Sequence, residues 1–284
     1  MKTLLKNPLV TQLIDIAFQE DIGPGDYTSL ATINEFEKGK SIIVVKDEGI
    51  LAGLELVEFI FKKVDPNLEI NLLKKDGDRV SYGDVAIEIT GSSRSMLTAE
   101  RTVLNFIQRL SGVATQTAKY VERLQGLHTQ ILDTRKTTPG MRLLEKWAVK
   151  IGGGANHRIG LYDMILIKDN HVDFAGGIEQ AILRTQEYLS RNGLKLKIEI
   201  ETRTMQEVRQ ALAVGGIDRI MLDNFNPELL REAVALINGV VETEASGGIT
   251  LDTLRAYAET GVDFISSGAL THSVKSMDLS MRAV

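Results

Sequence analysis

The stretch "LKIEIETRTMQEVRQALAVGGIDRIMLDN" (residues 196–224) decides the fold class of this 284-residue chain. It opens on a short run rich in isoleucine, continues with apolar residues at helical spacing, and returns to a second apolar run after Gly215 and Gly216. A strand, a helix and a second strand in this order predict a right-handed unit with parallel strands. The stretch therefore indicates an α/β protein.

The same unit recurs from about residue 130 to the end of the chain. The predicted strands are "TQILDT", "MILIKDN", "LKIEIET", "RIMLDN", "VVETEAS" and "VDFISSGA". The predicted helices between them are "IEQAILRTQEYLSRNG", "TMQEVRQALAVGG", "PELLREAVALING" and "TLDTLRAYAETG". Because the units are short and evenly spaced, we expect a closed α/β barrel rather than a doubly wound sheet.

The first part of the chain has a different pattern. Short strand-like runs with turn signals fill residues 27–95, and residues 54–64 have helical spacing between them. A helix is expected from Ser95, interrupted at Ser111 and Gly112 and followed by a second helix from Val113. This part therefore reads as a separate α+β module.

Composition narrows the class of protein further. The net charge of −5 argues against a broad nucleic-acid surface, so any cationic cluster would be local and suited to a small anion. There are no cysteines, which excludes disulfides and thiolate chemistry. The sequence has no secretory signal and no apolar run long enough to cross a membrane, so we expect a cytoplasmic protein.

Polar residues follow almost every predicted strand of the second part. They include Asp133, Arg135, Lys136, Lys168, Asp169, Glu199, Glu201, Asp223, Glu244, Ser246, Ser266 and Ser267. In an α/β barrel the carboxyl ends of the strands meet at one face, where catalysis takes place. We therefore expect these side chains to surround a single site.

The cations of this set predict a ligand with several negative charges. They are Arg135, Lys136, His157, Arg158 and Lys168, and arginine binds carboxylates and phosphates with two parallel hydrogen bonds. The adjoining residues 152–154 are three glycines, which form either a hinge or a place where the backbone approaches a ligand.

Two glycine-containing loops and a pair of acids complete the predicted site. "SGGIT" (residues 246–250) and "SSGAL" (residues 266–270) follow strands, as phosphate-binding loops do. Glu199 and Glu201 share one face of a strand. They either point to a hydrated rim or, with Asp223, bind Mg²⁺, ribose hydroxyls or a developing positive charge.

These residues lie in motifs that resemble the quinolinate phosphoribosyltransferase family. The motifs run in order from about residue 20 to 275: "EDIGPGDYTS", "TAERTVLNFIQRLSGVAT", "DTRKTTPGMRLLEKWAVKIGGGANHRIGLYDMILIKDNHV", "IEIET", "LDNF", "SGGI" and "SSGALTHS". The resemblance implies a type II phosphoribosyltransferase, with an N-terminal α/β sandwich and an incomplete, seven-stranded α/β barrel. The sandwich would span residues 1–112, completed by residues 273–284, and the barrel residues 113–272.

The resemblance also implies the reaction. Members of the family transfer phosphoribosyl from 5-phosphoribosyl-1-pyrophosphate to quinolinate with Mg²⁺. The products are nicotinate mononucleotide, pyrophosphate and CO₂, in NAD biosynthesis. The enzyme would be a homodimeric pentosyltransferase acting on small molecules, with neither a nucleic acid nor a membrane as partner.

The resemblance assigns roles to matching positions. Catalytic roles fall on Lys136, Lys168, Glu201 and Asp223, the last two also as metal ligands. Substrate binding is implied for Thr134, Arg135, Lys136, His157, Arg158, Lys168, Glu201, Asp223, Ser246, Gly247, Gly248, Ser267, Gly268, Ala269 and His272. Arg101 would reach into the partner subunit's site.

Three alternatives stay open at the level of sequence. A related transferase-like protein of molybdenum transport shares the fold but should lack part of the dicarboxylate-binding set. Lys168 could instead form a Schiff base, as in a class I aldolase barrel. A non-enzymatic anion-binding module would bind the ligand without releasing pyrophosphate.

Overall fold

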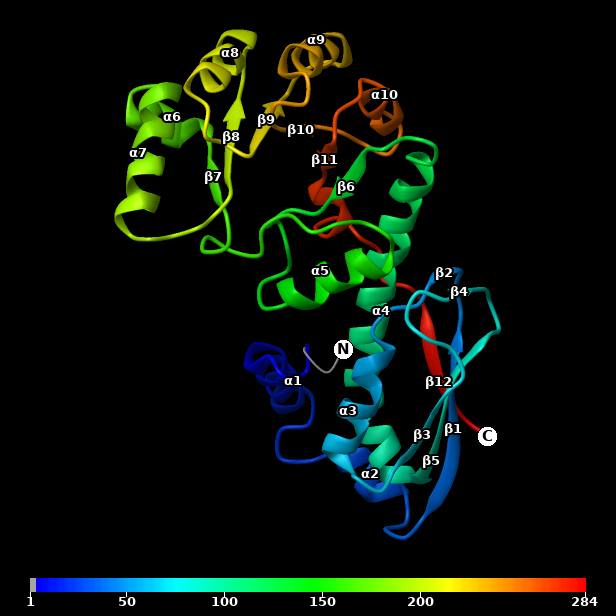
Figure 1. The fold of residues 1–284 in the computed structure, drawn as a ribbon. Coiled ribbons are helices and arrows are strands. Elements are labelled where there is room, and N and C mark those ends of the chain that lie inside the picture. The colour runs from blue at the N-terminus through cyan, green and yellow to red at the C-terminus, as the bar shows by residue number, and fades with distance from the viewer. Residues whose placement is uncertain (1–3) are drawn as a thin grey trace. The chain divides into compact units, whose positions relative to one another are not determined.

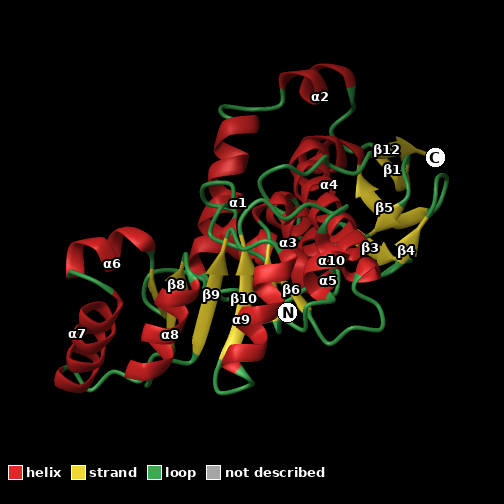
Figure 2. Cartoon of the chain, turned by 90° about the horizontal axis from the view of Figure 1, so that it is seen from above, coloured by secondary structure: helices red, strands yellow, loops and turns green. Residues whose placement is uncertain are grey.

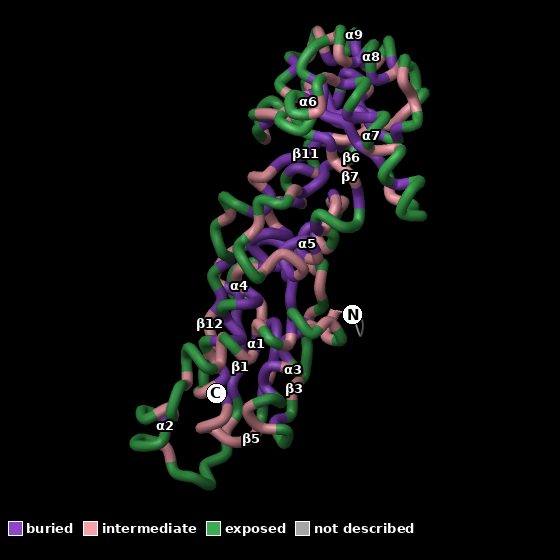
Figure 3. Tube along the Cα trace, turned by 90° about the vertical axis from the view of Figure 1, so that its left-hand side faces the viewer, coloured by how far each residue is buried: buried purple, intermediate pink, exposed green. Residues whose placement is uncertain are grey.

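The computed structural model describes residues 4–284 and divides into two compact units (Figure 1). Among the described residues, the first comprises 4–118, 137–153 and 270–284, and the second comprises residues 119–136 and 154–269. Each unit has buried segments of its own (Figure 3). The expected domain boundary after residue 112 stays a prediction. Within residues 4–284, no helix is long and apolar enough to span a membrane.

The first unit is built around an antiparallel sheet in the order β12-β1-β5-β3. Its strands are β1 (Lys38–Val45), β3 (Glu69–Leu72), β5 (Val85–Ser92) and β12 (Leu279–Ala283), and a small sheet pairs β2 (Gly49–Ile50) with β4 (Arg79–Val80). Its helices are α1 (Pro8–Asp21), α2 (Tyr27–Thr32), α3 (Leu54–Val64), α4 (Ser93–Arg123) and α5 (Arg142–Ile151). The C-terminal strand β12 pairs with β1 from Ser41 to Val45, so the two ends of the chain share one sheet.

Helix α4 runs without interruption through Ser111 and Gly112, so the predicted break there is wrong. The two small residues are needed for packing. Ser111 Oγ accepts a hydrogen bond of 2.9 Å from the main-chain N–H of Ala52. A Cβ on Gly112 would lie 2.4 Å from the main-chain oxygen of Lys275, so only glycine permits this approach.

Helix α5 occupies part of the segment between Lys136 and His157, where no helix is predicted from the sequence. Its C-cap is Gly152, the first of the three glycines. A Cβ on Gly152 would lie 2.4 Å from the main-chain oxygen of Ala114 on α4. The close backbone approach at Gly152 is therefore to a neighbouring helix.

The second unit is a parallel sheet in the order β6-β11-β10-β9-β8-β7 (Figure 2). All six predicted strands are present, as β6 (Gln130–Leu132), β7 (Ile165–Ile167), β8 (Ile198–Thr202), β9 (Arg219–Asp223), β10 (Glu242–Ser246) and β11 (Phe264–Ser266). The predicted helices are also confirmed, as α7 (Ile178–Arg191), α8 (Met205–Val214), α9 (Pro227–Ile237) and α10 (Leu254–Ala258). Helix α6 (Asp169–Ala175) and the 3₁₀ helix η1 (Gly268–Leu270) complete the unit's elements.

The sheet curls round so that its last strand, β11, pairs with its first, β6. Among the described residues β6 and β7 do not pair, so the closed barrel predicted from spacing is wrong and the incomplete barrel is confirmed. The resemblance implied seven strands, whereas six form ladders. The free edge of β6 instead makes a single parallel bridge between Leu132 and Ala155. The main-chain segment that follows Ala155 therefore starts on the open side of the barrel.

Candidate functional site

The candidate site lies at the carboxyl ends of the parallel strands. The cations and Thr134 follow the first two strands: Thr134, Arg135 and Lys136 come after β6, and Lys168 comes after β7. The acids Glu201 and Asp223 lie at the ends of β8 and β9. Ser246 ends β10 and is followed by Gly247 and Gly248, and Ser267, Gly268 and Ala269 follow β11. In a sheet of parallel strands these ends share one edge. The structure thus brings most of the predicted residues to one edge of the second unit.

The segment after Ala155 is fixed by the buried carboxylate of Asp133 at the end of β6. One carboxylate oxygen accepts a 2.9 Å hydrogen bond from the main-chain N–H of His157. The other accepts a 2.5 Å hydrogen bond from Asn156 Nδ2. This arrangement determines where Arg158 emerges.

Arg158 is only partly exposed, and its guanidinium donates a hydrogen bond of 3.3 Å to the main-chain oxygen of Met164. Burial lowers the pKa of this guanidinium, and the positive charge of Arg135 lowers it further. Two guanidinium groups close enough to repel each other form a site that favours an anion.

Glu201 and Asp223 lie on neighbouring strands, and Lys168 and Asp169 stand beside them. Burial raises the pKa of Glu201, and the negative charges of Asp223 and Asp169 act in the same direction. The positive charge of Lys168 lowers that pKa. Glu201 is 9 % exposed, so its carboxyl group lies near the rim without facing bulk water.

The loop after β10 depends on its glycines. Gly247 has φ +99°, and a Cβ there would clash with the side chain and main-chain nitrogen of Asn224. Asn224, itself at φ 59°, donates a 2.6 Å hydrogen bond from its side chain to Asp223. Glycine at position 247 therefore allows the loop after β10 to pass close to Asn224, the residue that follows Asp223.

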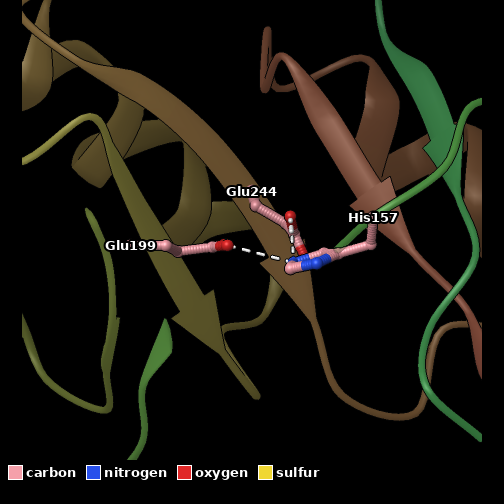
Figure 4. A group of neighbouring side chains, drawn as sticks. All are labelled: His157, Glu199 and Glu244. Atoms are coloured by element: carbon pink, nitrogen blue, oxygen red, sulfur yellow. Dashed lines mark ion pairs between the residues drawn. The ribbon is translucent and has the colours of Figure 1, made fainter. Parts of the chain in front are cut away.

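A buried polar cluster beneath the rim was not predicted as a unit (Figure 4). The side chains of Glu199, from β8, and Glu244, from β10, point toward the ring of His157. His157 Nε2 lies 3.0 Å from Glu199 Oε2 and 3.5 Å from Glu244 Oε2. Arg219, at the start of β9, donates a 2.9 Å hydrogen bond to Glu244. Glutamates at alternate positions of buried strands were the signal that could have revealed it.

The acids of this cluster share a low-dielectric environment. Burial raises the pKa of Glu199 to about 7, against the opposing charge of Arg219. Burial and then the neighbouring Glu199 raise the pKa of Glu244 to about 7. Burial of the two carboxyl groups and the repulsion between their charges therefore favour the protonated form of the pair.

The atoms of His157, Glu199 and Glu244 also lie close enough together to hold a metal ion, all within 4.8 Å of one another. The guanidinium of Arg219 already provides a positive charge to Glu244. A divalent ion here would have to compete with that cation. Arg219 therefore makes this cluster less favourable for a divalent ion.

Most of the chain matches two descriptions of one family. Residues 26–111 match "Quinolinate phosphoribosyl transferase, N-terminal domain", and residues 113–282 match "Quinolinate phosphoribosyl transferase, C-terminal domain". The chain belongs to the quinolinate phosphoribosyltransferase family. This result favours neither the molybdenum-transport alternative nor the aldolase alternative.

Relatives of this family cover nearly the whole chain. One, a "Probable nicotinate-nucleotide pyrophosphorylase [carboxylating]" of Bacillus subtilis, is 47% identical over 95% of this chain and 92% of its own. A chloroplastic nicotinate-nucleotide pyrophosphorylase [carboxylating] of Oryza sativa is 46% identical over 95% of this chain and 76% of its own. The solved nicotinate-nucleotide pyrophosphorylase of Francisella tularensis has a TM-score of 0.92 and 42% identity, covering 98% of this chain and 97% of that one.

Two residues predicted for the family site lie in the first compact unit. Arg101 is an exposed residue of α4, and His272 is exposed just after η1. His272 Nδ1 and Ser273 Oγ are 2.6 Å apart. The roles expected for both residues stay predictions.

Proposed function

We propose that the carboxyl edge of the parallel sheet carries out the quinolinate phosphoribosyltransferase (decarboxylating) reaction of this family. The activity transfers phosphoribosyl from 5-phosphoribosyl-1-pyrophosphate to quinolinate and releases pyrophosphate and CO₂. It supplies nicotinate mononucleotide to NAD biosynthesis. The observation that supports this site is that the cations Arg135 and Lys168 and the acids Glu201 and Asp223 all lie at the carboxyl ends of the parallel strands. The charge of Arg135 also acts on Arg158, and paired guanidinium groups match a substrate with two carboxylates.

Quinolinate would be held through its carboxylates. Arg135 and Arg158 would each bind a carboxylate oxygen pair, and Lys168 would contribute a point charge from the end of β7. Lys136 lies in the same short segment as Arg135, where its main-chain N–H donates a hydrogen bond to Thr134 Oγ1 at 3.0 Å. This lining would orient the ring nitrogen toward the sugar donor.

Transfer requires stabilisation of positive charge at the sugar carbon. The ring nitrogen forms a bond to that carbon while the bond to pyrophosphate breaks and its electron pair leaves with pyrophosphate. Glu201 and Asp223 would stabilise the cation-like carbon from the ends of β8 and β9, an electrostatic effect of several kcal/mol. After transfer, the bond between C2 and the 2-carboxylate breaks and CO₂ leaves. The electron pair stays on C2, where the adjacent positive ring nitrogen stabilises it, and C2 then takes up a proton; we place Lys168 near this carboxylate.

The acidic pair also fits Mg²⁺. Mg²⁺ is bound in proteins by one or two carboxylates together with substrate phosphates and water. Glu201 and Asp223 provide two such groups, and their mutual repulsion is the property that a cation would relieve. When bound, the ion would neutralise charge on the pyrophosphate leaving group.

The phosphate groups would lie against the glycine loops. Ser246, Gly247 and Gly248 follow β10, and Ser267, Gly268 and Ala269 follow β11. Main-chain N–H groups at such strand ends bind phosphate in many barrels. The main-chain N–H of Ser267 donates a 3.0 Å hydrogen bond to the main-chain oxygen of Leu132, which fixes the loop after β11 to β6. His272 would line the same phosphate pocket.

The remaining parts of the proposal concern assembly and location. We propose a homodimer in which Arg101 enters the partner subunit's site and supplies a further cation to the substrate. We also propose a cytoplasmic location for this chain, although some plant relatives carry names that place them in chloroplasts or mitochondria.

Replacing Arg135 by alanine tests the proposed site. Loss of a charge-assisted pair to a carboxylate should raise the KM for quinolinate by roughly tenfold or more. Steady-state assays at varied quinolinate, with the donor saturating, would measure it. The exposed Arg231 of α9, replaced by alanine, is the matched control and should behave as wild type. Unchanged kinetics in Arg135→Ala would remove Arg135 from the site.

A further inference from the structure

All three nitrogens of the Arg109 guanidinium, on α4, donate hydrogen bonds within the first compact unit. Nε and Nη2 donate bonds of 3.0 and 2.7 Å to one carboxylate oxygen of Glu145, on α5. Nη1 donates a 3.1 Å bond to the main-chain oxygen of Val274, and Nη2 donates one of 2.5 Å to that of Thr271. One side chain therefore connects α4 both to α5 and to the segment that follows η1.

The two main-chain oxygens that Arg109 binds belong to the residues on either side of His272 and Ser273. The ring of His272 is exposed, and its Nδ1 lies 2.6 Å from Ser273 Oγ. Further along the chain, the main-chain N–H of Met277 donates a 3.0 Å hydrogen bond to the main-chain oxygen of Gln108. Helix α4 therefore fixes the main chain around His272 and leaves the ring exposed.

The contacts of Arg109 exceed what an ion pair with Glu145 needs. Glu145 is fully buried, so its carboxylate requires a cation, and a lysine could supply that charge. The bonds to the oxygens of Thr271 and Val274 need further donors in fixed directions, which the planar guanidinium provides and an ammonium group does not. Arginine at this position thus matches the task of holding the segment 271–274.

We infer that Arg109 is a positioning residue that holds His272 in place for the phosphate groups of the sugar donor, acting through the main chain of residues 271–274. The inference rests on the proposed function, which assigns His272 to the phosphate pocket. Arg109 acts through its bonds to this segment and makes no contact with the substrate itself.

Arg109→Lys separates the two tasks of the guanidinium. The lysine keeps a positive charge for Glu145, and Glu145 keeps the 3.1 Å hydrogen bond that its other oxygen accepts from the main-chain N–H of Thr138. The two bonds to the segment 271–274 are lost. The KM for the sugar donor should rise by roughly tenfold, and the KM for quinolinate should stay within about twofold of wild type. A larger rise for quinolinate than for the donor would overturn the inference.

Arg94→Lys is the matched control. Arg94 lies on the same helix, about four turns before Arg109. Its guanidinium also binds two main-chain oxygens, that of Ile33 at 2.8 Å and that of Leu30 at 3.1 Å. Both KM values should stay within about twofold of wild type in this variant. An equal rise of the donor KM in the two variants would show a general effect of loosening α4 and would overturn the positioning role.

A double-mutant cycle with His272→Ala tests the route of the effect. If Arg109 acts through His272, the donor KM of Arg109→Lys/His272→Ala should equal that of His272→Ala alone. Independent, multiplying effects on the donor KM would show that Arg109 acts by another route. An unchanged donor KM in His272→Ala would likewise overturn the inference.

A second variant keeps the test open if Arg109→Lys does not fold. In Arg109→Gln/Glu145→Gln no buried charge is left without a partner, and the two amides can bond to each other while the bonds to residues 271–274 are weakened. Thermal unfolding would confirm that this variant is folded. Its donor KM should rise by at least about fivefold with little change for quinolinate, and wild-type values for both would contradict the inference.

The outcomes distinguish this inference from the proposed function. If wild-type protein makes no nicotinate mononucleotide from quinolinate and the donor, the proposed function fails. If wild-type protein is active and Arg109→Lys has the donor KM of wild type, the proposed function stands and the positioning role is wrong.

Discussion

At the scale of single residues, the buried acids beneath the rim have a consequence for stability. The pKa of Glu244 is raised to about 7 by burial and by Glu199, from an ordinary value of 4.5. Because the folded-state pKa lies above the unfolded one, the folded protein keeps protons that the unfolded chain releases as the pH rises from about 4.5 to 7. The free energy of unfolding contributed by this group is therefore present below that window and is lost as the pH rises through it.

Glu244→Gln should flatten this dependence. Because burial also raises the pKa of Glu199, the variant keeps the contribution of that residue, and the wild-type protein should lose up to about 3 kcal/mol more than the variant between pH 4.5 and 7. Denaturant unfolding at closely spaced pH values would measure both. If the free energy of unfolding changed with pH by the same amount in the wild-type protein and in the variant, the assignment would be contradicted.

Also at this scale, the residues at the carboxyl ends of the strands were easier to predict from the sequence than the buried cluster beneath them. Arg135, Lys168 and Glu201 could be predicted because each ends an apolar run, and strand ends converge in an α/β fold. The partnership of Glu199 with Glu244 and His157 could not, because it joins β8, β10 and the segment after Ala155 through side-chain contacts alone. Periodicity indicates faces of strands but not which faces meet in three dimensions.

At the scale of elements, one prediction failed and one helix was not predicted, both for the same physical reason. The expected break in α4 and the unrecognised helix α5 both involve polar or small residues that are buried. Ser111 is hydrogen-bonded to Ala52, and Glu145 of α5 is fully buried, bound by Arg109 at 2.7 Å. Polar and small residues of this kind indicate a loop or a helix break when only the local sequence is considered. Here their hydrogen bonds are made by residues distant in the sequence, which a local pattern does not contain.

Gly152→Ala tests the contact between α5 and α4. The new Cβ would meet the main-chain oxygen and carbon of Ala114 and the side chain of Thr117, so we expect a loss of about 1–3 kcal/mol in the free energy of unfolding. Thermal and denaturant unfolding would measure it.

Gly77→Ala is the control for this substitution. A Cβ at Gly77 meets nothing within 4 Å, so only its left-handed backbone, with φ +91°, adds strain, about 1 kcal/mol. Equal losses in the two variants would show that crowding against α4 is not the cause in Gly152→Ala.

At the scale of the whole molecule, the proposed assembly makes a quantitative prediction. If Arg101 serves the partner subunit's site, Arg101→Ala and Lys168→Ala should each be inactive alone. After mixing and re-equilibration, half of the dimers would be mixed, and each would contain one intact site. The mixture should therefore regain about a quarter of wild-type activity, measured as pyrophosphate release. A mixture that stays as inactive as its components would rule out the shared site.

The central claim is that the edge of the parallel sheet joins quinolinate to the sugar donor and then releases CO₂. The most direct test is release of labelled CO₂ from quinolinate carrying the label in its 2-carboxyl group, followed with and without 5-phosphoribosyl-1-pyrophosphate. We predict release only when the donor and Mg²⁺ are present, in equal amount to pyrophosphate, since the ring nitrogen carries the positive charge that stabilises the electron pair on C2 only after ribosylation. Release without the donor, or none with both substrates present, would contradict this account.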